Sequence, residues 1–156
     1  METFAFDWSR FLDYLFKIGM AFVLSLPVAL DRERSSRNLG LRTFPLVAIG
    51  SCGYILITTA IVSPDSHDAL TRVIQGLMTG IGFVGGGAIL KEENQVHGTS
   101  TAASIWATGA LGVAVGYNQY EIAVLIALVT FLTLRVLNTS KSLLPEPEKR
   151  SEHHEV

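Results

Sequence analysis

The sequence contains the run Gly76-Leu-Met-Thr-Gly80-Ile-Gly82-Phe-Val-Gly85-Gly86-Gly87-Ala-Ile-Leu90, in which six of its fourteen glycines occupy twelve positions. In water this run would make a poor helix, because each glycine costs up to about 1 kcal/mol of helix propensity relative to alanine. Inside a bilayer the backbone must satisfy its own hydrogen bonds, so the run stays helical and its missing side chains admit a close neighbour. Pairs of glycines four apart have the spacing of packed membrane helices. The packing residues that this run predicts are Gly76, Gly80, Gly82 and Gly86.

A nucleotide-binding motif is also present in this run, because Gly80-Ile-Gly82-Phe-Val-Gly85 matches G-x-G-x-x-G. The dinucleotide fingerprint requires a preceding strand and an acidic residue about 20 positions further on. No Asp or Glu lies between Glu93 and Glu121. The glycines are therefore interpreted as helix-packing residues.

Composition favours one membrane domain. The 156 residues are 49% hydrophobic and only 17% charged, which is too apolar for an ordinary soluble domain of this size. The net charge of −2 gives no indication of nucleic acid binding, and Cys52, the single cysteine, cannot form an internal disulfide. We predict the lipid bilayer as a partner and no nucleic acid.

Apolar segments divide the chain into five predicted membrane helices, so the fold class is an all-α polytopic membrane protein with packing faces of small residues. Most Lys and Arg residues lie in alternate connections and in the polar tail over 138–156, which places the amino terminus outside and the carboxy terminus in the cytoplasm. The transmembrane domain covers 1–137, with helices over about 11–30, 44–62, 69–90, 99–116 and 121–137.

Some polar side chains fall inside these spans. Lys17 lies one turn after Asp13, so it is either part of a local ion pair or a functional intramembrane charge. Arg72 lies near the outer end of the third span and can extend toward water, whereas Gln75 is deeper and needs a partner on another helix.

The first connection, over 31–43, is polar and carries both acids and arginines. It is either a simple determinant of topology or an ordered loop in which Asp31 or Glu33 pairs with Arg32, Arg34 or Arg42.

The fourth span has the most regular packing face. Small residues recur every four positions, and we expect this face to pack against the third span or another copy of the chain. The face consists of Ser100, Ser104, Thr108, Gly112 and Gly116.

Catalytic and metal-binding patterns are weak throughout. Ser100 or Ser104 near His97 is too poorly specified for a nucleophile and base, and the histidines His67, His153 and His154 are interpreted as solvated residues. We predict no enzyme, no cofactor and no metal site.

Several motifs in one order resemble the bacterial MgtC/SapB family of inner-membrane proteins. The resemblance covers about residues 17–121 and rests on Leu30-Asp-Arg-Glu-Arg34, Gly40-Leu-Arg-Thr43, Ser63-Pro-Asp-Ser66, Gly80 to Leu90 and Val96 to Trp106.

This resemblance implies a role in adaptation to low magnesium and, in pathogens, in growth inside macrophages. It also implies a regulator of membrane proteins such as the membrane sector of the ATP synthase, and a shorter, SapB-type member without a soluble carboxy-terminal domain. Two functions stay open: a regulatory module acting through helix contacts, as a homo-oligomer or with a membrane-protein partner, and a small magnesium or other cation channel or transporter. Candidate functional residues are Lys17, Asp31, Arg32, Glu33, Arg42, Arg72, Gln75 and Ser100.

Overall fold

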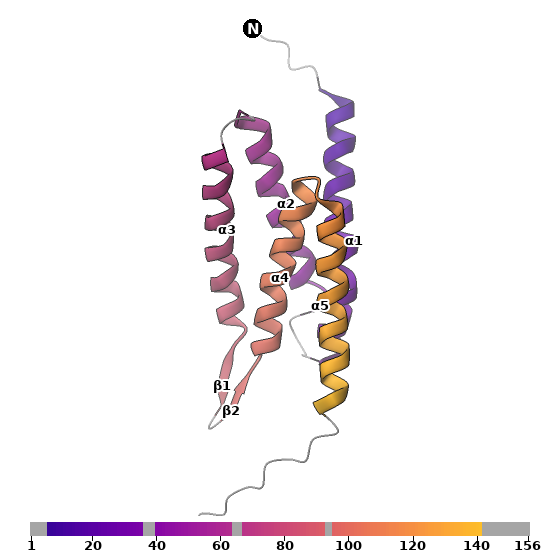
Figure 1. The fold of residues 1–156 in the computed structure, drawn as a ribbon, viewed down its shortest axis with the longest axis vertical. Coiled ribbons are helices and arrows are strands. Elements are labelled where there is room, and N and C mark those ends of the chain that lie inside the picture. The colour runs from indigo at the N-terminus through magenta and orange to yellow at the C-terminus, as the bar shows by residue number, and fades with distance from the viewer. Residues whose placement is uncertain (1–5, 36–39, 64–66, 93–94, 142–156) are drawn as a thin grey trace, which may run out of the picture.

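The computed structural model describes residues 6–35, 40–63, 67–92 and 95–141, and these form five helices and one short hairpin (Figure 1). The fold is therefore helical, as the apolar segments predict. Two helices, α1 and α2, are long and apolar enough to cross a membrane. The elements are α1 (Trp8–Ser35), α2 (Thr43–Ile61), α3 (His67–Gly87), β1 (Leu90–Glu92), β2 (Gln95–His97), α4 (Thr99–Gly116) and α5 (Tyr120–Lys141).

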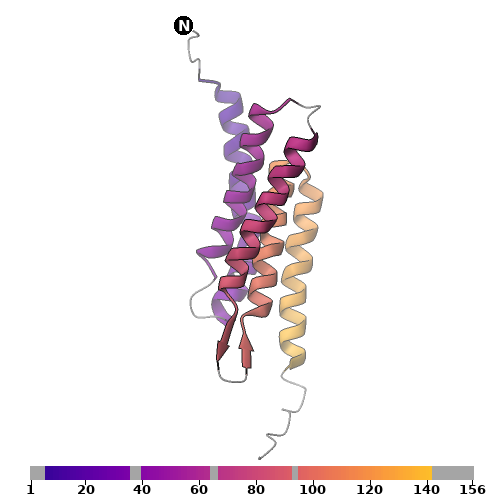
Figure 2. The ribbon, with the colours of Figure 1, turned by 90° about the vertical axis from the view of Figure 1, so that its left-hand side faces the viewer.

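Helix α4 is the centre of the bundle, because it packs against all four other helices. Helix α1 also packs against α2 and α5, whereas α3 packs on α4 and less closely on α2. Figure 1 shows α3 standing at one side of the bundle, and Figure 2 shows it as the helix nearest the viewer. The hairpin joins α3 to α4 at one end, which we call the hairpin end.

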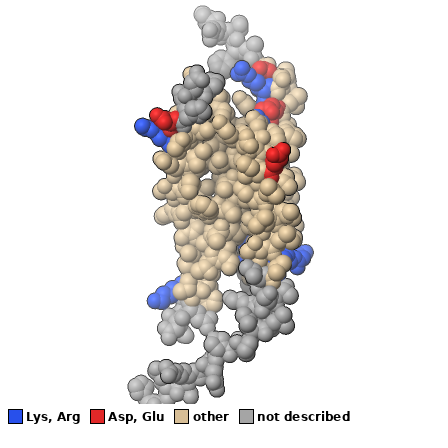
Figure 3. Space-filling model, in the orientation of Figure 1, with Lys and Arg blue, Asp and Glu red and all other residues tan. Residues whose placement is uncertain are grey.

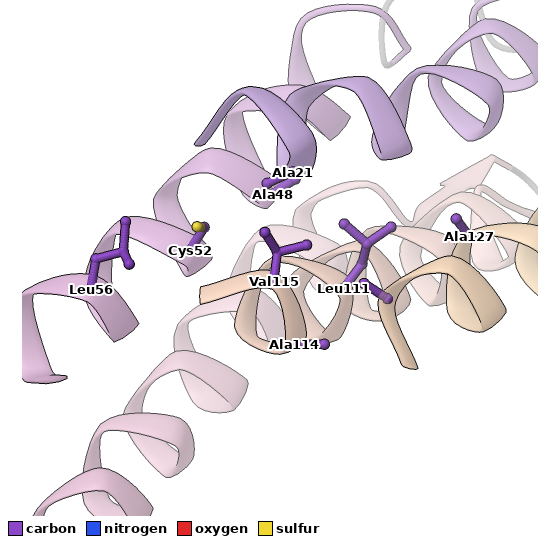
Figure 4. Close-up of a cluster of buried hydrophobic side chains, with 9 residues drawn as sticks. Ala21, Ala48, Cys52, Leu56, Leu111, Ala114, Val115 and Ala127 are labelled. Atoms are coloured by element: carbon purple, nitrogen blue, oxygen red, sulfur yellow. The ribbon is translucent and has the colours of Figure 1, made fainter. Parts of the chain in front are cut away.

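Two clusters of buried apolar residues fill the bundle. The cluster in Figure 4 draws its side chains from four helices, with Ala21 on α1, Cys52 on α2, Leu111 on α4 and Ala127 on α5. Five of its nine buried residues are alanine, so the helices pack closely. The second cluster lies nearer the hairpin end and consists of Val28, Ala29, Phe44, Ala88, Ile105 and Leu134.

Several helix bounds differ from the predicted spans, most clearly the ends of α1, α3 and α5, which extends to Lys141. Helix α1 continues to Ser35, five residues beyond the predicted end, because polar residues end an apolar segment without breaking the helical backbone. Its last turn carries Arg32 and Arg34, which suit the negative end of the helix dipole. Helix α3 ends at Gly87, after three successive glycines of low helix propensity.

The connection between α3 and α4, for which no secondary structure was predicted, contains the antiparallel pair of β1 and β2. Leu90 pairs with His97 and Glu92 with Gln95. Gly98 then enters α4 with a φ of 86°, and a Cβ there would collide with the carbonyl oxygen of Ala88. Only glycine fits this position, so Gly98 fixes how closely α3 and α4 approach at the hairpin end.

Charges and apolar side chains are separated along the bundle. On the face drawn in Figure 3, acidic and basic residues lie toward the upper end, basic residues lie toward the lower end, and an uncharged band lies between them. Large apolar side chains are exposed along the helices, including Leu128, Val129 and Leu132 on α5. This pattern suits a helix bundle whose middle contacts lipid.

Candidate functional site

The buried face of α1 carries two cations, Lys17 in the first half of the helix and Arg32 in its last turn. Lys17, Ala21, Ser25, Ala29 and Arg32 are all buried and follow one another at spacings of three or four residues. At 1.5 Å per residue, the two cations lie about 22 Å apart along the helix. Small residues occupy the positions between them, so other helices approach this face closely.

Lys17 forms an ion pair with a carboxylate one turn earlier on the same helix. Its Nζ lies 2.6 Å from Oδ2 of Asp13. The Lys17 side chain is 9% exposed and the Asp13 side chain 49% exposed, so the pair leads from the bundle interior to its surface. Of the two interpretations of Lys17, the structure contains the local ion pair.

Arg32 belongs to a more deeply buried ion pair. Its Nη2 lies 2.7 Å from Oδ2 of Asp31, and the two side chains are 5% and 11% exposed. Its Nε is buried without a hydrogen-bond partner. Charges are costly to bury, so this pair depends on both members being present. The sequence had placed Arg32 in a polar connection, whereas it lies on the buried face of α1.

Glu33 ties the start of α2 back to the end of α1. The backbone N–H of Leu41 donates to Oε2 of Glu33 over 2.9 Å. Gly40 lies so close to the Glu33 backbone that a Cβ there would overlap it. Arg42 is exposed and forms no ion pair within the described part of the chain. Of the two acids, Asp31 therefore pairs with Arg32, whereas Glu33 accepts a hydrogen bond from the backbone of Leu41.

The small face of α4 lies against α2. A Cβ at Gly112 would strike the carbonyl oxygen of Ala48, and one at Gly116 would lie 2.8 Å from Cβ of Ile55. Ser104 and Thr108 are buried, and their hydroxyls donate to carbonyls one turn earlier on α4. Ser100 is exposed and lines a pocket of about 290 Å³ between α4 and α5.

The glycines of α3 have a different environment. A Cβ at Gly76, Gly80, Gly82 or Gly86 would meet nothing within 4 Å, whereas one at Gly85 would lie 3.2 Å from the carbonyl oxygen of Ala102 on α4. Gly76 and Gly80 line a groove of about 490 Å³ between α2 and α3. The intramolecular contact of α3 with α4 thus uses Gly85, which the spacing argument did not select.

Two of the candidate residues, Arg72 and Gln75, are exposed on α3. No contact among the described residues joins them to Lys17 or Arg32. A second groove, of about 340 Å³, separates α3 from α4 and α5 and is lined by Trp106. In the described residues, no three His, Cys, Asp or Glu side chains gather in one place.

Sequence reasoning missed the burial of Arg32 and the contacts of Gly85 and Gly98. A signal for Arg32 exists in the spacing of Lys17, Ala21, Ser25 and Ala29, which continues to position 32. If these residues are interpreted as one helix face, the predicted helix continues beyond the apolar segment and includes position 32.

A helical bundle with large exposed apolar side chains and two helices long and apolar enough to cross a membrane has the features of a membrane protein. The chain belongs to the MgtC family, whose model matches residues 18–143.

Curated relatives agree with this assignment. SrpB of Synechococcus elongatus is 34% identical over 139 residues, which cover 82% of this chain and 75% of SrpB. MgtC of Salmonella typhimurium strain LT2 is 34% identical over 143 residues, covering 88% of this chain and 60% of that protein.

YhiD of Escherichia coli K12, which its name describes as a candidate magnesium transporter, is 29% identical over 131 residues, covering 81% of this chain and 61% of YhiD. The chain thus spans about three fifths of MgtC and YhiD. No solved structure matches it significantly.

Proposed function

We propose that this protein is a non-enzymatic, multi-pass protein of the bacterial inner membrane that acts in adaptation to low magnesium through helix contacts inside the bilayer. Membership of the MgtC family and the magnesium-related name of YhiD support the connection with magnesium. The partner would be another copy of the chain or another membrane protein.

One observation carries the preference for regulation over conduction. The charged side chains that the described residues bury are two cations, Lys17 and Arg32, and each already holds a carboxylate. Mg²⁺ binds hard oxygen ligands, usually with carboxylates among them, and gives up its water slowly. An interior whose buried charges are cationic and whose nearby acids are occupied is a poor path for a dication.

Tight packing around the central helix α4 also favours regulation over conduction. Gly112 and Gly116 bring the α4 backbone directly onto α2, which leaves no space for an ion between these two helices at that level. A pore lined by backbone carbonyls needs irregular backbone, but this part of α4 is regular helix.

A flux measurement tests the proposal. Purified protein in sealed liposomes loaded with a magnesium-sensitive dye should show no Mg²⁺ entry above empty vesicles when a gradient is applied. Vesicles that contain a known magnesium channel provide the positive control. Saturable, protein-dependent entry would overturn the regulatory proposal in favour of the second candidate, a magnesium channel or transporter, which the name of YhiD favours.

The proposed topology has its own test. With five spans and the amino terminus outside, cysteines introduced at Ser63 and Gln119 should react with an impermeant thiol reagent added from outside, because both residues are exposed at the end opposite the hairpin. Cysteines at Lys91 and Val96, exposed on the hairpin, should react only after the membrane is opened. The measurement uses a Cys52→Ser background, and the reverse labelling pattern would refute this orientation.

A further inference from the structure

The groove of about 340 Å³ between α3 on one side and α4 and α5 on the other is here called the Trp106 groove. Trp106 lines it together with apolar side chains of all three helices, among them Ile74, Met78, Val113 and Ile122. Trp106, Met78 and Ile122 are each nearly half exposed, so the groove is accessible from outside the bundle. Helix α3 does not pack closely on α5, and the groove is open between these two helices.

Polar side chains line this groove at one end only. Tyr117 and Gln119 lie at the end of the bundle opposite the hairpin, and both are exposed. The side-chain hydrogen bond at this turn joins Tyr120 to Asn118. Within the described residues, the Tyr117 hydroxyl and the Gln119 amide have no hydrogen-bond partner. The groove therefore suits a molecule with a long apolar part and a polar end.

The length of the groove matches one leaflet of a bilayer. On α4 its lining runs from Trp106 to Tyr117, which is about 16 Å at 1.5 Å per residue. A hydrocarbon core about 30 Å thick gives each leaflet about 15 Å. If α4 crosses the membrane, as the proposed function requires, Tyr117 lies at the interface, where tyrosines are common, and Trp106 lies near the bilayer centre.

Volume and lining exclude other occupants. One turn of an α-helix is 10–12 Å wide and 5.4 Å long and so occupies more than about 400 Å³, which is more than the whole groove holds. Ions and sugars need several polar partners, which the groove offers only at its end. An acyl chain is narrow, flexible and apolar, and the membrane supplies one directly beside the open side.

We propose that the Trp106 groove binds one acyl chain of a phospholipid from the leaflet opposite the hairpin. The head group of this lipid accepts hydrogen bonds from the Tyr117 hydroxyl and the Gln119 amide, which are both donors. The chain fills the space between α3 and α5, which do not pack closely on each other. This proposal rests on the membrane placement in the proposed function.

Quenching of Trp106 fluorescence by brominated lipid tests the site. The chain has two tryptophans, so a Trp8→Phe background leaves Trp106 as the only one. The full-length protein, in a constant amount of detergent, is titrated with phosphatidylethanolamine brominated near the ends of its acyl chains. We expect saturable quenching at about one lipid per protein. Lipid brominated near the carbonyl should quench less, because Trp106 lies far from Tyr117. Quenching that rises linearly, or that is equal for both lipids, would refute the site.

A substitution that fills the groove should block the lipid. Ala110 is half-buried and lines the groove between Trp106 and Tyr117. Ala110→Phe places a ring where the acyl chain would lie, and it should weaken binding at least tenfold. Val124→Phe is the matched control, because Val124 is exposed on α5 and does not line the groove. Equal affinities of the two variants would contradict the proposal.

The head-group contacts have a separate test that leaves the core intact. Tyr117→Phe and Gln119→Ala each remove one exposed hydrogen-bonding group, and each should weaken lipid binding about threefold. Unchanged affinity in both variants would refute the proposed position of the head group. These measurements do not depend on magnesium flux, so the lipid site can fail while the regulatory proposal stands. Labelling of Ser63→Cys reports separately on membrane placement.

Discussion

Gly112→Leu is expected to prevent stable assembly of the bundle and to lower its free energy of unfolding by at least about 3 kcal/mol. Even a Cβ at this position would collide with the carbonyl oxygen of Ala48 and lie 2.8 Å from Cβ of Ser51. Backbone cannot move aside as a flexible side chain can, and overpacking a filled core costs about 1–3 kcal/mol even for smaller insertions. Thermal unfolding in detergent, followed by size-exclusion chromatography, measures the loss.

Gly80→Leu is the matched control, because it makes the same substitution on a neighbouring helix. A Cβ at Gly80 would meet nothing within 4 Å, and the groove between α2 and α3 has room for a larger side chain. We expect its unfolding midpoint to stay close to that of the unsubstituted protein. If the two variants lose equal stability, contact of Gly112 with α2 is not what holds α4 in place.

Asp31→Ala should lower the free energy of unfolding by about 3–5 kcal/mol, because it leaves the guanidinium of Arg32 buried without its counter-ion. Arg32 is 5% exposed and already has one unpartnered nitrogen, so little water reaches it. Arg32→Met should cost less, since methionine fills part of the space without a charge. The double variant should lose less than the sum of the two single losses, because the unpaired charge is gone.

An exposed pair provides the control for this cycle. Arg10 and Asp7 are also an ion pair, at 3.3 Å, but their side chains are 77% and 52% exposed. Arg10→Ala should therefore change stability by less than about 1 kcal/mol. Chemical unfolding of all variants under one condition compares the pairs. Strict additivity of Asp31→Ala and Arg32→Met would mean that their ion pair does not contribute to the fold.

The sequence predicted the helices well because apolar segments of sufficient length leave few alternatives in a membrane. It predicted the end of α1 poorly, since Asp31, Arg32 and Glu33 are polar but still helical. It also missed the hairpin, because strands of three residues are too short to show a periodic pattern. Hydropathy therefore locates the apolar length of a helix, whereas its true ends depend on capping and tertiary contacts.

Which face meets which neighbour could not be worked out from spacing. Gly112 and Gly80 both lie in rows of small residues, yet one touches the backbone of α2 and the other meets nothing in its own chain. Small residues permit another helix to approach closely, but which helix does so depends on where the remaining helices lie. On α3 as well, only the structure shows that Leu77 and Ile81 line the groove toward α2 whereas Gln75 is exposed.

The central position of α4 has a consequence for biosynthesis. Helices α1 and α2 pack against each other, but α3 is secured chiefly by α4, which follows it in the chain. Under the proposed five-span topology, the first three helices would therefore enter the bilayer with α3 only loosely attached, until α4 has been synthesised and inserted. Assembly completes late, and nascent chains that stop before α4 present an open bundle to the proteases of the membrane.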